Sequence, residues 1–211
     1  MRGTVKQAGL DFKERFLRVF SWCLVKTVHR PKRYGPKPAL DEPTIFACRH
    51  VGLMDPVILM VEYYRMMVRP LVAQDYVEKN GFTRKFYPIA QCIPIERRRA
   101  STKWLEAASK ALEKGESVII YPEGKRNKTG EGLLPFHSGA ALLSARTGAR
   151  IVPVWNAMWK FPHRYRFAIG EPFHLDPLPP EGESAGWLRE QTKKVQDAVA
   201  ALEPGKNPFW K

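Results

Sequence analysis

The sequence predicts an α/β fold: one domain with a mixed β-sheet and flanking helices, preceded by an N-terminal amphipathic helical segment. Three observations support this. Short runs rich in β-branched and aromatic residues alternate with helical stretches, as in βαβ units. The length of 211 residues is typical of a single domain. With 44% hydrophobic and 27% charged residues, the chain can build a core, and disordered or collagen-like classes are excluded.

The expected elements follow in order along the chain. Strands are predicted at 44–48, 68–73, 92–95, 117–121, 151–155 and 164–169. Helices are predicted at 56–67, 102–114, 138–147 and 183–202, where apolar residues recur at helical spacing or a polar stretch follows a proline-rich loop.

The N-terminal segment carries much of the charge. Residues 1–38 hold ten Lys or Arg against two acidic residues, and the whole chain has a net charge of +14, which implies an anionic partner. Apolar Phe12, Phe16 and Phe20 recur at four-residue steps while charged residues lie on another face. We therefore expect an amphipathic helix over 10–29.

Three prolines and a glycine in 30–38 predict a basic linker after this helix. The chain is then expected to divide into a basic amphipathic helix and linker, 1–38, and a folded domain, 39–211. The three cysteines have no metal-ligand or disulfide spacing, so a reducing compartment is expected. The longest uncharged run has 13 residues, so neither a transmembrane helix nor a signal peptide is expected.

A His–Asp pair follows the first predicted strand. His50 and Asp55 are five positions apart around a strand-to-helix turn. In such a turn the Asp55 carboxylate can accept the Nδ1 proton of the imidazole, which leaves Nε2 to take a proton from a substrate hydroxyl. The alternative is structural: Asp55 before Pro56 as a helix N-cap, and His50 as a turn residue.

Basic residues follow two further strands. Arg97 comes after the third predicted strand, and its planar guanidinium suits bidentate binding of phosphate. After the fourth strand, Gly124 allows close approach of the backbone to an anion, and Lys125 and Arg126 supply positive charge. Glu123 is expected to position a hydroxyl or orient Arg126. Each cluster alone is also consistent with ordinary surface charges.

In their order along residues 44–155, these motifs resemble the glycerophospholipid acyltransferase family, which includes 1-acylglycerol-3-phosphate acyltransferase. The family's His-x4-Asp block is matched by His50 and Asp55, its FPEGTR block by 121–126, its Phe-x-x-Gly-Ala stretch by 136–140 and its apolar-Pro-apolar block by 152–154. Three positions depart from the pattern: Arg49 replaces a common asparagine, Gln91 a usual glycine and Lys125 a usual threonine. We expect a site more basic than the family pattern.

The resemblance implies transfer of a fatty acyl group from acyl-CoA or acyl-ACP, as co-substrate, to the free hydroxyl of a lysophospholipid. The implied acceptor is 1-acyl-sn-glycerol-3-phosphate and the product phosphatidic acid. His50 would be the general base and Asp55 its orienting partner, with no metal and no other cofactor. The implied acceptor-binding residues are Arg97, Glu123, Gly124, Lys125 and Arg126.

A lysolipid lies in a bilayer, so we expect the N-terminal segment to bind a membrane surface. The expected location is the cytoplasmic face of a membrane, with the protein peripheral or monotopic.

Two alternatives stay open: another acceptor, such as lyso-ornithine lipid or a larger lysophospholipid, and a basic membrane- or nucleic-acid-binding protein without activity. No nucleic-acid motif accompanies the charge, so no nucleic acid is expected as partner. A G-x-S-x-G string at 182–186 lacks the preceding strand that a nucleophile elbow needs.

Overall fold

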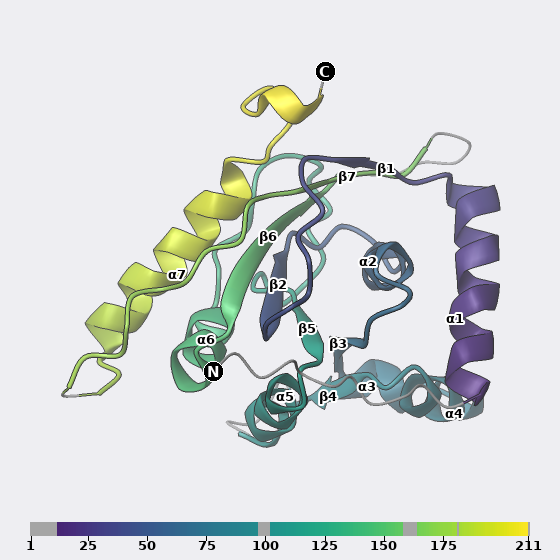
Figure 1. Ribbon diagram of the computed structural model, residues 1–211, viewed down its shortest axis with the longest axis horizontal. Coiled ribbons are helices and arrows are strands. Elements are labelled where there is room, and N and C mark those ends of the chain that lie inside the picture. Colours follow the sequence, from purple (N-terminus) through teal and green to yellow (C-terminus); the bar gives the residue numbers. More distant parts are fainter. Residues whose placement is uncertain (1–11, 97–101, 158–163, 181, 211) are drawn as a thin grey trace.

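A seven-stranded sheet forms the centre of the computed structural model, which describes residues 12–96, 102–157, 164–180 and 182–210. The strand order is β1-β7-β6-β2-β5-β3-β4 (Figure 1). The strands are β1 (Lys32–Tyr34), β2 (Thr44–Cys48), β3 (Val68–Ala73), β4 (Ile93–Ile95), β5 (Ser117–Ile120), β6 (Arg150–Asn156) and β7 (Arg166–Ile169). Neighbours are parallel except β6 and β7, which pair antiparallel, so the predicted mixed sheet is confirmed.

Helices cover both faces of this sheet. They are α1 (Phe12–Leu24), η1 (Val25–His29), α2 (Asp55–Glu62), α3 (Gln74–Val77), α4 (Gly81–Ile89), α5 (Lys103–Glu113), α6 (Gly139–Thr147), α7 (Ala185–Ala200) and η2 (Pro208–Trp210). Helices α5, α6 and α7 pack on one face, where Leu112, Leu143 and Val195 join the core. Helix α2 covers the other face through Ile58, and α1 stands beside α2 (Figure 1).

The central strands β2, β5 and β6 are buried along their whole length. Their apolar runs are continuous, as expected for parallel strands covered on both faces. The registers Ala47↔Ile120 and Cys48↔Val154 bring the carboxyl ends of these strands to one edge of the sheet. The loops that carry the predicted site residues therefore meet at that edge.

The segment predicted as a linker contains a strand. Lys32–Tyr34 forms β1, which pairs in parallel with β7 in the register Lys32↔Arg166. Tyr34 is buried, and its ring centroid lies 4.7 Å from that of Trp210. Apolar periodicity cannot indicate a three-residue edge strand, because its hydrogen-bonding partner lies near the other end of the chain.

Two helices, α3 and α4, occupy a region where the sequence indicated no element. Helix α4 begins at a capping box in which the Asn80 side chain accepts the N–H of Thr83 at 2.9 Å. The helix predicted over 56–67 ends earlier, at Glu62. The next residue, Tyr63, is buried with its ring centroid 5.2 Å from that of Phe46.

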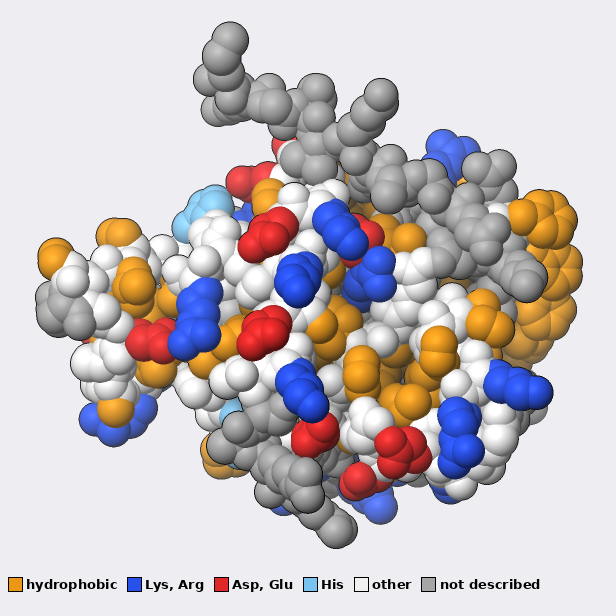
Figure 2. All heavy atoms as spheres, turned by 90° about the horizontal axis from the view of Figure 1, so that it is seen from below, with side chains coloured by type: hydrophobic (Ala, Val, Ile, Leu, Met, Phe, Trp, Pro, Cys, Tyr) orange, Lys and Arg blue, Asp and Glu red, His pale blue; other side chains and the backbone are white. Residues whose placement is uncertain are grey.

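The expected N-terminal amphipathic helix is present as α1. Phe12, Phe16 and Phe20 are 79%, 65% and 56% exposed, so this apolar face is not covered by the domain. Figure 2 shows apolar side chains gathered along the edge of the molecule that α1 forms. Within the described ranges, every helix is too short or too polar to cross a membrane.

Two truncations test whether β1 belongs to the folded domain. Removing residues 1–24 deletes the exposed α1 and should change the free energy of unfolding by no more than about 1 kcal/mol. Removing residues 1–38 also deletes the buried Tyr34 and the β1–β7 pairing, and should lower it by about 3 kcal/mol or more. Urea denaturation measures both. Equal midpoints for the two truncations would contradict the place of β1 in the sheet.

Candidate active site

The His50–Asp55 pair is formed in the structure. Nδ1 of His50 lies 2.8 Å from Oδ2 of Asp55, the first residue of α2. The N–H groups of Val51 and Gly52 donate to the same oxygen at 2.7 and 2.9 Å. The N-cap residue is Met54, so the Asp55 carboxylate does not serve as the cap. An Nδ1–H tautomer fits this acceptor, and Nε2 has no hydrogen-bond partner among the described residues.

Tyr165 also reaches Asp55, which nothing in the sequence indicated. Its hydroxyl donates to Oδ1 of Asp55 at 2.7 Å. Tyr165 precedes β7, and because β7 runs antiparallel to β6, its start lies at the carboxyl edge of β6. Burial, and then the Asp55 charge, raise the pKa of Tyr165 well above its ordinary value, so the hydroxyl stays protonated and remains a donor. These donors compensate for the loss of water around a carboxylate that is 1% exposed.

Glu123 has a different role from the one expected. Its Oε1 accepts the N–H of His50 and its Oε2 the N–H of Leu134, both at 2.9 Å. Glu123 is 2% exposed and does not line the cavity beside His50. It therefore holds the backbone of the site and is not placed to position a substrate hydroxyl or orient Arg126. The N–H of Asn127 donates to the His50 carbonyl at 2.6 Å, which fixes His50 from its other side.

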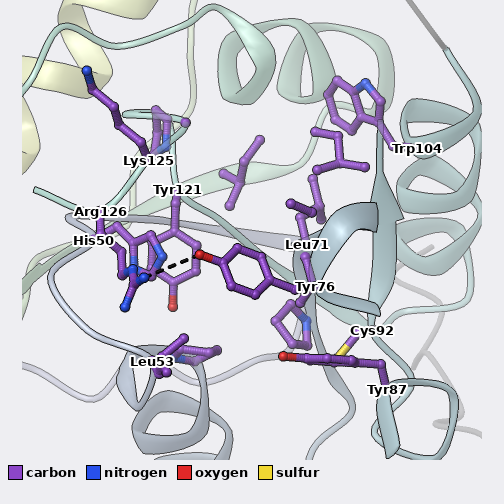
Figure 3. Close-up of a pocket in the computed structure, with 18 of the residues that line it drawn as sticks. His50, Leu53, Leu71, Tyr76, Tyr87, Cys92, Trp104, Tyr121, Lys125 and Arg126 are labelled. Carbon is purple, nitrogen blue, oxygen red and sulfur yellow. Dashed lines mark hydrogen bonds between the residues drawn. The ribbon is translucent and has the colours of Figure 1, made fainter. Parts of the chain in front are cut away.

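His50 faces a cavity of about 1090 Å³. Figure 3 shows His50 and Arg126 side by side at one end, with Leu71 and Trp104 away from them, and the Lys125 side chain extending away from the imidazole. The cavity thus has a cationic region beside the imidazole and an apolar region farther off. Such a cavity suits an amphiphilic ligand that joins an anionic group to a hydrocarbon chain.

The residues of the 121–126 turn differ in burial and in the contacts they make. Gly124 has φ +66, and a Cβ there would lie 2.9 Å from Cδ2 of His137, so glycine is required. Lys125 is exposed, and Arg126 is half-buried with Nη2 donating to the Tyr76 hydroxyl at 3.3 Å. Arg97, the other expected phosphate ligand, lies outside the described residues. The structure thus brings Gly124, Lys125 and Arg126 to the cavity beside His50.

Arg49 does not make the cavity more basic, contrary to expectation. It is 1% exposed, and its guanidinium lies 4.5 Å from the centroid of the Trp155 ring. Nε and Nη1 donate to the carbonyl oxygens of Gly132 and Asn156 at 2.8 and 2.9 Å. Burial lowers the pKa of Arg49. Successive side chains of an extended segment point to opposite sides, so Arg49 and His50 diverge.

Gln91 does line the cavity, but its backbone conformation is unfavourable for a residue with a side chain. Its φ of +53 lies in the left-handed region, where a side chain costs about 1–2 kcal/mol relative to the glycine usual in the family. Its Oε1 is buried and has no hydrogen-bond partner in the part of the chain that the structure describes. Gln91 therefore occupies space in the cavity that a glycine would leave open.

Two other chemical candidates are inert in this structure. Ser184 is the N-cap of α7, and its hydroxyl oxygen accepts the N–H of Trp187 at 3.1 Å, so it is not a nucleophile elbow. Cys92 lines the cavity, but burial raises the pKa of its thiol to about 12. In the part of the chain that is described, no group of three or more potential metal ligands comes together.

The comparisons with known proteins assign the chain to a family and agree with this fold. A family model described as Acyltransferase matches residues 26–157, and the chain therefore belongs to this family and is an acyltransferase enzyme. A Caenorhabditis elegans protein named among the 1-acyl-sn-glycerol-3-phosphate acyltransferases is 25% identical over 92% of this chain and 70% of its own length. A Helicobacter pylori protein named 1-acyl-sn-glycerol-3-phosphate acyltransferase is 32% identical over 49% of this chain and 46% of its own length.

A solved structure shows the same fold. The crystal structure of the 1-acyl-sn-glycerophosphate (LPA) acyltransferase PlsC from Thermotoga maritima superposes with a TM-score of 0.60 at 19% identity. The match covers 96% of this chain and 86% of the Thermotoga chain. The mixed sheet with flanking helices is therefore an acyltransferase fold.

The cysteines should differ in alkylation. Cys23 is exposed on α1 and should react with iodoacetamide at pH 8, whereas Cys92 should stay unmodified because its thiol pKa of about 12 leaves little thiolate. The alkylation rate of Cys92 should rise as the pH approaches 12. Peptide mass spectrometry at a series of pH values measures both rates. Labelling of Cys92 as fast as Cys23 at pH 8 would contradict the burial of this thiol.

Proposed function

We propose that the protein transfers a fatty acyl group from acyl-CoA or acyl-ACP to the free hydroxyl of 1-acyl-sn-glycerol-3-phosphate, giving phosphatidic acid. The observation that carries this proposal is the orientation of His50 by Asp55. Nδ1 is held by the carboxylate, Nε2 has no partner among the described residues, and the imidazole faces a cavity with a cationic and an apolar region. Acceptor and product are supported by the names of the relatives.

In the proposed reaction, Nε2 of His50 accepts the proton of the acceptor hydroxyl as its oxygen attacks the thioester carbonyl. The ester C–O bond forms, the C–S bond breaks, and the leaving sulfur takes the proton from His50. No covalent enzyme intermediate is required. Asp55 keeps the imidazole in the required tautomer and stabilises its protonated form. Arg126 and Lys125 bind the acceptor phosphate.

We also propose that α1 binds the surface of the membrane that supplies the acceptor, on its cytoplasmic side. Phe12, Phe16 and Phe20 form an exposed apolar face on α1, and Ser21 of the same helix lines the cavity. Leu53, in the loop after His50, is 62% exposed and also lines the cavity. A bilayer bound by α1 would therefore lie next to the opening through which a lysolipid enters.

The reaction is tested by mass spectrometry of lipid products. Purified protein is incubated with a panel of lysolipids, including lysophosphatidic acid and lyso-ornithine lipid, and with acyl-CoA or acyl-ACP. Wild type should form phosphatidic acid, and His50→Ala should lower kcat by about 10²- to 10⁴-fold because the general base is lost. The control His174→Ala removes an exposed imidazole that faces Glu42 and does not line the cavity, and it should be silent. If product forms only from another lysolipid, that lysolipid is the acceptor in place of lysophosphatidic acid. Equal turnover by His50→Ala and wild type would refute the mechanism.

Membrane binding is tested by flotation with vesicles that contain anionic lipid. The triple variant Phe12→Ser, Phe16→Ser and Phe20→Ser should reduce the bound fraction at least about tenfold, since each buried Phe contributes roughly 1.5–3 kcal/mol. The control Phe209→Ser changes a phenylalanine that is 38% exposed near the other end of the chain and should float like wild type. Unchanged flotation of the triple variant would exclude α1 as the membrane-binding element.

A further inference from the structure

A tyrosine faces the arginine of the cavity. Tyr76 belongs to α3 and lines the cavity with Arg126. The hydroxyl oxygen of Tyr76 accepts a hydrogen bond from Nη2 of Arg126 at 3.3 Å (Figure 3). Among the described residues, no carboxylate forms an ion pair with Arg126. The guanidinium therefore has a neutral partner in the cavity.

The contact leaves donors of both groups unused. A guanidinium has five N–H donors, and the Tyr76 hydroxyl takes one of them. A hydroxyl that accepts from Arg126 keeps its own proton to donate elsewhere. An oxyanion placed against the pair would receive hydrogen bonds from both residues. Phosphate, with several charged oxygens, matches such a pair of donors.

Tyr76 also lies at the boundary between the two regions of the cavity. In Figure 3 its hydroxyl points toward Arg126 and His50, and the rest of the side chain lies toward Leu71. An aromatic ring with a polar tip suits such a boundary, since one end packs on hydrocarbon and the other forms a hydrogen bond. A ligand that joins a phosphate to an acyl chain would contact both ends of this residue.

We propose that Tyr76 is a specificity-determining residue that binds the acceptor phosphate together with Arg126. This inference rests on the proposed function, in which Arg126 binds that phosphate. Tyr76 favours acceptors that carry a phosphate over those that do not, because a phosphate accepts hydrogen bonds from both the Tyr76 hydroxyl and Arg126, and a headgroup without phosphate offers them no charged acceptor. The residue was missed in the sequence because α3 was not predicted and its partner, Arg126, follows another strand.

The test compares two ligands that differ only in phosphate. Binding of a short-chain lysophosphatidic acid and of the monoacylglycerol with the same chain is measured calorimetrically on the full chain, without thioester. Tyr76→Phe removes only the hydroxyl and should weaken lysophosphatidic acid binding about tenfold, as expected for a hydrogen bond to a charged group. Binding of the monoacylglycerol should not change. In turnover, the KM for lysophosphatidic acid should rise while kcat and the KM for the thioester stay constant.

The matched control is Tyr87→Phe. Tyr87 also lines the cavity but lies away from Arg126 in Figure 3. Loss of its hydroxyl should leave the ratio of the two affinities at the wild-type value. A packing role would alter the affinities for both ligands equally, so the ratio separates phosphate binding from packing.

Each outcome distinguishes the inference from the proposed function. Equal loss for both ligands, or no loss for either, in Tyr76→Phe would overturn the inference even if phosphatidic acid is formed. A selective loss for lysophosphatidic acid would support the phosphate site even if no donor yields product. Failure of wild type to prefer lysophosphatidic acid over the monoacylglycerol would overturn the inference, whichever acceptor is acylated.

Discussion

The Asp55 carboxylate is buried, and its hydrogen bonds organise the catalytic edge. It accepts from the His50 imidazole, from the N–H groups of the next two residues, and from Tyr165, which lies 110 positions away. A carboxylate without these donors would be costly to bury, and without the carboxylate the buried Tyr165 hydroxyl would lose its acceptor. Orientation of the imidazole is therefore coupled to the docking of β7 on the sheet.

A second buried carboxylate completes this support. Glu123 joins the backbone at His50 to the backbone at Leu134, so the loops after β2 and β5 are held together from inside. The imidazole is thus fixed at Nδ1 by Asp55, while its backbone is fixed by Glu123 and Asn127. Because Nδ1 is held by Asp55, Nε2 is the ring nitrogen that can take the proton, as general-base catalysis requires.

The charge of the chain is distributed differently from what its sequence suggests. The net charge is +14, yet Arg49 is buried against Trp155. Arg150 is also buried, and it pairs with Glu42 at 2.9 Å. Among the described residues, the cations that line the cavity include the exposed Lys125 and the half-buried Arg126, which lies beside His50 (Figure 3). A small number of placed cations, rather than the total charge, defines the region suited to an anionic headgroup.

The sequence by itself determined the fold class and the His50–Asp55 pair. The strands at 44–48 and 68–73 have the predicted bounds, because buried strands are marked by apolar runs that are local in the chain. The pair is local too, since both residues belong to one strand-to-helix turn. Only the tertiary structure decided the edge strand β1, the hydrogen bonds of Tyr165 and Glu123, and the burial of Arg49 against Trp155. Each of these depends on partners distant in sequence, and a pattern of neighbouring residues carries no information about such pairings.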